Sequence, residues 1–205
     1  MQHTQPSTQS NGILDLAQSQ RLLSAADVRA QGWSPQLLIK LEQSGKLQRV
    51  TRGLYSLPDS PLTEHKSLIE VCRRVPKAVV CLLSALQFHG IGTQAPFEVW
   101  IALPEGTQSP ALTYPPLRIA RLRGEAYSEG METVVEQGFT IRVYSVAKTI
   151  TDCFKFRHKI GLEVAMEALK DAWQQRRLNM DEVMHFANVN RVAKVMQPYL
   201  EAVVA

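Results

Sequence analysis

The tightest constraint on the fold is a pair of closely spaced helix signals near the N-terminus. Ser24 is a hydroxyl residue of the kind that caps a helix, and Asp27 follows three residues later, as in a capping box. Gly32 stands where a residue in the left-handed conformation ends a helix. Ser34 then opens a second helix, over residues 35–44, because a hydroxyl cap is followed by proline at the first helical position. Two short helices joined by a glycine turn are therefore predicted.

The second of these helices is predicted to have one apolar and one polar face. Leu38 and Leu41 form an inward stripe. Gln36, Lys40 and Gln43 are spaced at i, i+4 and i+7, so they share the opposite face. Amide and cationic side chains are thus expected to point to solvent together.

A basic hairpin is predicted directly after the helix pair. Residues 47–50 and 54–57 read as two short strands, and the turn between them holds a glycine that supplies a positive φ. An apolar pattern over residues 13–23 predicts a further helix before the pair. A helix pair followed by such a hairpin predicts a winged helix-turn-helix over residues 11–58, a fold that places its second helix in the major groove of DNA.

The polar residues of this region have the chemistry that duplex DNA requires. Glutamine can pair with adenine, lysine can reach guanine or a phosphate, and a helix start can bind a phosphate. Basic residues of the hairpin suit the DNA backbone or the minor groove. The predicted DNA-binding residues are Ser34, Gln36, Lys40, Gln43, Lys46, Arg49, Thr51 and Arg52.

The distribution of charge favours this interpretation without requiring it. The whole chain carries a net charge of +4, and residues 21–57 alone hold six basic and two acidic side chains, which is the same excess. Two alternatives stay open: a helical domain whose polar face is only solvated, and a winged helix that binds a protein.

The remainder of the chain predicts a second domain, so the fold class is α+β: an N-terminal winged helix-turn-helix followed by a mixed α/β domain with a helical C-terminal tail. Pro58 and Pro61 mark the division, and residues 62–205 alternate between apolar strands and amphipathic helices. Residues 1–10 are predicted to be a disordered polar tail. No run of about 18 apolar residues occurs, so no membrane span is expected. The odd number and wide spacing of the cysteines favour reduced thiols in a cytosolic protein, so the predicted location is the cytoplasm.

Signals for enzyme chemistry are weak. The cysteines Cys72, Cys81 and Cys153 show no metal-ligand spacing, and the chain contains neither a Walker A loop nor a GxSxG motif. We therefore expect no cofactor, no metal and no catalytic residue. The alternative is an enzyme that acts on nucleic acid, with the winged helix as its targeting module and Asp152 or Glu98 as its carboxylate.

Two further basic stretches lie in the second domain. Residues 154–159 read FKFRHK, in which aromatic side chains alternate with cations. Asp152 has lysines at i−4 and i+3, a spacing that predicts ordinary ion pairs on a solvated helix face. The second stretch holds Arg118, Arg121 and Arg123. A solvated face is the favoured interpretation of both stretches, and a surface that meets a partner is the alternative.

Two motifs together resemble the AbiEi-type antitoxins of type IV toxin–antitoxin systems. The first follows the pattern G-x-L-x-R-V-x-R-G-[VL]-Y and is formed by Gly45, Leu47, Arg49, Val50, Arg52, Gly53, Leu54 and Tyr55. The second, at residues 145–152, follows S-x-x-[KR]-T-[IL]-x-D, which resembles a signature of the family's second domain. The resemblance spans residues 21–155.

The resemblance implies a bacterial, cytoplasmic transcriptional repressor that binds inverted repeats in double-stranded DNA and regulates its own operon. It also implies an antitoxin role against a nucleotidyltransferase-like toxin, without a stable complex between the two. Carried onto this sequence, it makes Gln36, Lys40, Arg49 and Arg52 DNA contacts. It makes Lys148, Lys155 and Lys159 candidates for an antitoxin surface on the second domain.

Overall fold

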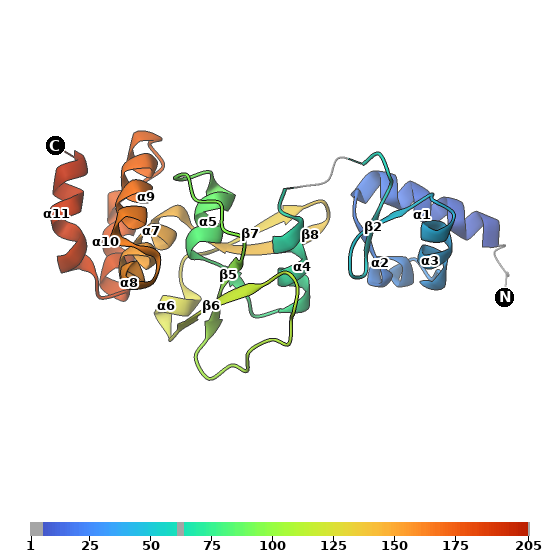
Figure 1. The fold of residues 1–205 in the computed structure, drawn as a ribbon, viewed down its shortest axis with the longest axis horizontal. Coiled ribbons are helices and arrows are strands. Elements are labelled where there is room, and N and C mark those ends of the chain that lie inside the picture. Colours follow the sequence, from blue (N-terminus) through green and yellow to red (C-terminus); the bar gives the residue numbers. More distant parts are fainter. Residues whose placement is uncertain (1–5, 61–63, 205) are drawn as a thin grey trace. The chain divides into compact units, whose positions relative to one another are not determined.

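The computed structural model describes residues 6–60 and 64–204 and confirms the α+β fold class (Figure 1). The chain divides into two compact units. The first holds residues 1–66 together with 135–139, and the second holds residues 67–134 together with 140–205.

The first unit has the element order helix, strand, helix, helix, hairpin. Its small sheet is antiparallel with the strand order β1-β3-β2, so the hairpin is joined by a strand that comes before the helix pair. This is the order expected of a winged helix. The elements are α1 (Pro6–Gln20), β1 (Leu23–Ser24), α2 (Ala25–Ala30), α3 (Gln36–Gln43), β2 (Gln48–Thr51) and β3 (Leu54–Ser56).

The capping signals explain where α2 begins. The Ser24 hydroxyl oxygen accepts hydrogen bonds from the amides of Ala26 and Asp27, and the Asp27 carboxylate accepts one from the Ser24 amide. Gly32 follows the helix with φ +74°, which confirms the predicted left-handed position.

The core of this unit forms where three helices meet. Ile13 and Ala17 of α1 pack with Val28 of α2 and Leu38 of α3, and all four are buried. Gly12 allows α1 to approach closely, because a Cβ atom at this position would lie 2.6 Å from the indole ring of Trp33.

Two predictions at helix starts are wrong. Residues 1–5 of the predicted disordered tail lie outside the described residues, but α1 already begins at Pro6, a residue that suits the first turn of a helix. Helix α3 begins at Gln36, and the Ser34 hydroxyl does not cap it. Instead, the amides of Leu37 and Leu38 donate to the main-chain carbonyls three residues earlier, at 3.1 Å each, so the first turn is satisfied without a side chain.

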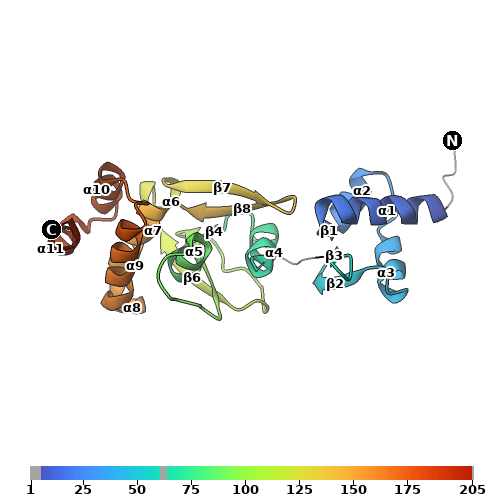
Figure 2. The same cartoon turned by 90° about the horizontal axis from the view of Figure 1, so that it is seen from above.

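The second unit contains a mixed five-stranded sheet with the order β6-β5-β4-β8-β7. Strands β7 and β8 lie side by side at one edge of it (Figure 2). Strand β4 is antiparallel to β5 and parallel to β8, and β5 is parallel to β6. The elements are α4 (Lys66–Arg74), β4 (Val79–Val80), α5 (Leu82–His89), β5 (Val99–Pro104), β6 (Leu117–Leu122), α6 (Glu125–Ser128), β7 (Met131–Glu136) and β8 (Phe139–Tyr144).

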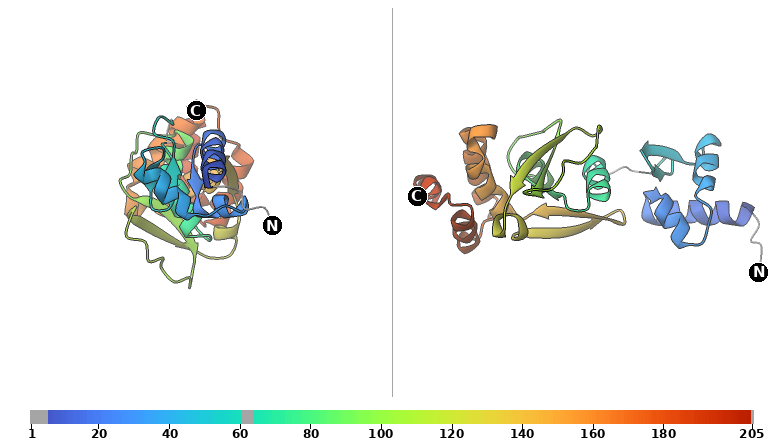
Figure 3. Two further views of the ribbon diagram at one scale, coloured as in Figure 1. Left: turned by 90° about the vertical axis from the view of Figure 1, so that its right-hand side faces the viewer. Right: turned by 90° about the horizontal axis from the view of Figure 1, so that it is seen from below.

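The chain ends in a group of helices (Figure 3). Helix α7 packs against α5, α9 and α10, and is therefore enclosed on several sides. These elements are α7 (Val146–Lys155), α8 (Arg157–Ile160), α9 (Leu162–Gln174), α10 (Met180–Val189) and α11 (Ala193–Val204). Among the described residues, none of the helices is both long enough and apolar enough to cross a bilayer.

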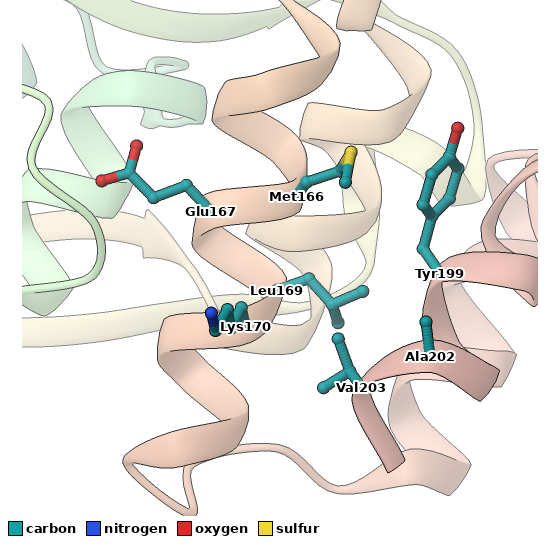
Figure 4. Close-up of a pocket in the computed structure, with 7 residues that line it drawn as sticks. All are labelled: Met166, Glu167, Leu169, Lys170, Tyr199, Ala202 and Val203. Carbon is teal, nitrogen blue, oxygen red and sulfur yellow. The ribbon is translucent and has the colours of Figure 1, made fainter. Parts of the chain in front are cut away.

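Helices α9 and α11 leave an apolar groove between them. Met166 and Leu169 of α9 face Tyr199 and Val203 of α11 across it (Figure 4). Its walls are almost entirely hydrocarbon, so the groove itself offers little polar chemistry.

Candidate nucleic-acid interface

Helix α3 has the two faces that its sequence predicts. Leu37, Leu38 and Leu41 are buried beneath it, with 8%, 1% and 5% of their surface exposed. The predicted contact residues of the opposite face are all exposed: Gln36, Lys40 and Gln43. The burial of the leucines fixes the rotation of the helix, and this rotation turns the amides and the lysine outward.

One residue of the outer face was missed by the sequence argument. Ile39 is 50% exposed, although it is a large apolar side chain. It follows Gln36 by three residues and precedes Gln43 by four, so it belongs to the same face. Helical spacing could have placed it there, and an apolar side chain in a major groove can contact the methyl group of thymine.

The hairpin after α3 carries the basic residues of the predicted wing. Lys46, Arg49 and Arg52 are exposed, and Thr51 is half-buried. Gly53 adopts φ +75° at the turn, as predicted. Gln48 has a structural role instead, because its amide nitrogen donates to the carbonyls of residues 57 and 58 at 3.2 and 3.1 Å.

The start of α3 is less suited to a phosphate than predicted. Ser34 is exposed, but the amides of Leu37 and Leu38 already donate to main-chain carbonyls. Fewer main-chain amides than expected are therefore free to donate to a phosphate at the start of α3.

Residues 147–152 of the second motif are buried, which contradicts the predicted solvated face. Ser145 caps α7 by accepting a hydrogen bond from the Lys148 amide. The Lys148 ammonium lies 2.5 Å from Asp152 Oδ1, and the two side chains are 0% and 1% exposed. Lys148 is therefore no part of an antitoxin surface, and the physical reason is that α5, α9 and α10 enclose α7.

Helix α10 completes this buried charge network. The Asn190 amide nitrogen, just after α10, donates to Asp152 Oδ1 at 2.7 Å and to the Thr151 hydroxyl at 3.1 Å. The Lys155 ammonium donates to Asn190 Oδ1 at 3.2 Å. Burial raises the pKa of Asp152, and the adjacent Lys148 ammonium counteracts this shift.

Of the three lysines predicted for an antitoxin surface, only Lys159 is exposed. Lys155 is half-buried and tied to Asn190, and burial lowers its pKa. The sequence could not separate the three, because helical spacing shows neither which side of α7 other helices cover nor that α7 ends at Lys155, which places Lys159 on α8.

The carboxylates that an enzymatic alternative would use are both engaged. Asp152 is enclosed with Lys148, and Glu98 pairs with Arg118 at 3.0 Å. The described part of the chain brings together no group of three His, Cys, Asp or Glu side chains able to hold a metal ion. The cysteines are free and buried, and burial raises the pKa of the Cys81 and Cys153 thiols.

The N-terminal segment matches a known family. Residues 13–58 fit the sequence model of the family described as "Transcriptional regulator, AbiEi antitoxin". The resemblance predicted from the first motif is therefore confirmed over this segment, which contains every predicted DNA-binding residue. The segment is similar to transcriptional regulators of the AbiEi antitoxin type.

A solved structure shares the fold over most of the chain. It is the crystal structure of the RV2827C protein from Mycobacterium tuberculosis, which is 13% identical and matches with a TM-score of 0.58. The match covers 88% of this chain and 71% of that one. At this identity the likeness concerns the fold alone. No curated protein matches the chain.

Proposed function

We propose that the chain is a sequence-specific, DNA-binding transcriptional repressor that acts as the antitoxin of a type IV toxin–antitoxin system and regulates its own operon. The observation that carries this proposal is the exposed polar face of α3, which continues along the chain into a basic hairpin. Both features lie in the segment that matches the AbiEi antitoxin family of transcriptional regulators.

In this proposal α3 enters the major groove of double-stranded DNA. Gln36 and Gln43 contact base edges, where glutamine can bond adenine with two hydrogen bonds, and Lys40 contacts guanine or a phosphate. Arg49 and Arg52 of the wing bind the phosphate backbone. Two copies on an inverted repeat would bind half-sites separated by about 34–36 Å, one turn of the double helix.

The second unit serves the antitoxin role in the cytoplasm, without catalysis and without a stable complex with its toxin. The toxin that it counteracts is a nucleotidyltransferase-like protein encoded beside it. Lys159 is the exposed member of the three candidate lysines, so it is the one that a partner can reach.

An electrophoretic mobility shift assay with the region upstream of the operon tests the DNA site. The variant with Lys40, Arg49 and Arg52 all changed to alanine should lose specific binding. A matched control removes three exposed lysines of the second unit, Lys77, Lys170 and Lys194, and so changes the net charge equally. Unchanged affinity of the first variant, or equal loss in the control, would reject the site.

Growth assays test the antitoxin role separately. Co-expression with the neighbouring toxin gene should restore growth, and the triple variant of the DNA site should still do so from an unrelated promoter. Failure of the wild-type chain to restore growth would reject the antitoxin role and leave the repressor role in place.

A further inference from the structure

Two basic stretches that are far apart in the sequence meet at one cleft of the second unit. The cleft has a volume of about 440 Å³, within the range of small-molecule sites. One side comes from β5 and β6, and the other from the α7–α8 junction. Its lining residues are Trp100, Arg118, Ile119, Ala120, Phe156 and Lys159.

The sheet side of the cleft follows from the register of two parallel strands. Trp100 of β5 pairs with Arg118 of β6, and Ala102 pairs with Ala120. Because side chains alternate along a strand, Trp100, Arg118 and Ala120 lie on one face of the sheet. Ala120 has only a methyl group, which leaves space beside the indole, and β6 is an edge strand of the sheet.

The Arg118 side chain is held in position. Its guanidinium carbon lies 5.8 Å from the centre of the Trp100 ring, and its Nε and Nη2 atoms each lie 3.0 Å from Glu98 Oε2. The side chain remains 58% exposed. A planar cation fixed beside an aromatic ring is a suitable surface for stacking a flat ligand.

Lys159 supplies a second positive charge at the cleft. Glu98 pairs with Arg118 and does not neutralise this lysine. It is exposed, and its ammonium lies 5.6 Å from the centre of the Phe156 ring. Over the described ranges, no carboxylate lies within ion-pair distance of this ammonium. The lysine is therefore available to an anionic group of a ligand.

We propose that this cleft binds a nucleotide, with its base against the Arg118 guanidinium and the Trp100 and Phe156 rings and its phosphate at Lys159. Aromatic rings beside cations are how proteins hold unpaired nucleotides without reading their sequence. A simple anion would not require the two rings, and an apolar ligand would not require the two cations. The nucleotide can be a free one or part of a single strand.

The NMR signals of three indole N–H groups make a direct test possible. In the full-length chain labelled with ¹⁵N-tryptophan, Trp33, Trp100 and Trp173 are the only indoles. Titration with AMP, CMP, GMP or UMP should shift the Trp100 signal in a saturable manner and leave the other two unchanged. Titration with a single-stranded oligonucleotide of ten residues should shift the same signal, and the tighter of the two ligands identifies the source. An unchanged Trp100 signal with all of these ligands would overturn the proposal.

Variants separate a nucleotide site from general attraction between charges. Lys159→Ala should weaken nucleotide binding about tenfold, because the phosphate loses a charge-assisted hydrogen bond. Lys170→Ala removes an exposed lysine that lines a different pocket and should have no effect. Equal weakening by both variants, or equally tight binding of inorganic phosphate, would overturn the proposal.

The inference does not rest on the proposed DNA site. The variant with Lys40, Arg49 and Arg52 changed to alanine should bind mononucleotides as the wild type does, because these residues belong to the other unit. If that variant loses the Trp100 shift, the cleft is not an independent site and the proposal fails.

Discussion

Removing the ammonium group of the buried charge network should destabilise the second unit strongly and in a pH-dependent way. In Lys148→Met, the Asp152 carboxyl would keep the Asn190 amide as a hydrogen-bond donor but lose its counter-charge. The folded chain must then either bury an unpaired carboxylate or protonate it.

The loss of unfolding free energy can be worked out from the case in which Asp152 becomes protonated. The pKa of an unperturbed aspartate is about 3.9, and each pH unit is equivalent to about 1.4 kcal/mol. Keeping Asp152 neutral at pH 7 therefore costs about 4 kcal/mol, which agrees with the 3–5 kcal/mol found when one partner of a buried pair is removed. At pH 5 the same neutralisation costs about 1.5 kcal/mol.

Urea unfolding of wild type and variant at both pH values measures this difference. The loss of unfolding free energy in Lys148→Met should shrink by about 2.5 kcal/mol between pH 7 and pH 5. Lys148→Met combined with Asp152→Leu should be less destabilised at pH 7 than the single variant, because no charge is left buried. Lys170→Met, on the surface, is the control. A single-variant loss below about 1 kcal/mol, or a loss that is independent of pH, would refute the reasoning.

Three further predictions concern other parts of the chain. Arg52→Ala should weaken binding to all DNA sequences and reduce by about 1 the slope of log affinity against log salt concentration. Gln36→Ala should mainly relax the discrimination between bases. Binding isotherms of both variants at several salt concentrations distinguish the two effects. Burial lowers the pKa of His89 below its usual value of about 6.5, while its ring donates to the Tyr144 carbonyl at 2.7 Å. The folded state therefore disfavours protonation of the His89 ring. The neutral ring's contribution to the free energy of unfolding is complete above about pH 6.5 and is lost as the pH falls through the pKa of the folded state. Thermal melts of His89→Gln at decreasing pH should lack that decline in stability. Gly12→Val should lower the melting temperature by several degrees because its side chain would collide with the indole packed on α1, and an unchanged melting temperature would show that α1 can shift without loss.

Local signals made the first unit predictable from the sequence. The Ser24 hydroxyl and the Asp27 carboxylate accept hydrogen bonds from main-chain amides in the first turn of α2. Gly32 and Gly53 adopt the positive φ that their positions require. The two faces of α3 follow from its own periodicity. The prediction failed at the starts of two helices: α1 already begins at Pro6, and main-chain carbonyls satisfy the amides that Ser34 was expected to cap.

The second unit depends on contacts between residues that are far apart in the sequence, and local patterns do not reveal such contacts. A lysine and an aspartate four residues apart look the same on a solvated helix and on an enclosed one. Burial of Lys148 and Asp152 is decided by helices that follow later in the chain, including the donor Asn190. Strand β7 has a weak signal in the sequence, because several of its side chains are exposed and show no clear apolar alternation.

The two motifs that carry the family resemblance therefore have different physical roles. The first presents Arg49 and Arg52 to solvent, while the second forms a buried network that joins α7 to the end of α10. A residue pattern of the second kind preserves an internal arrangement and does not mark a contact surface. Loss of antitoxin activity in a Lys148 variant would consequently report on folding, and a surface role is better tested at Lys159, whose replacement leaves this network intact.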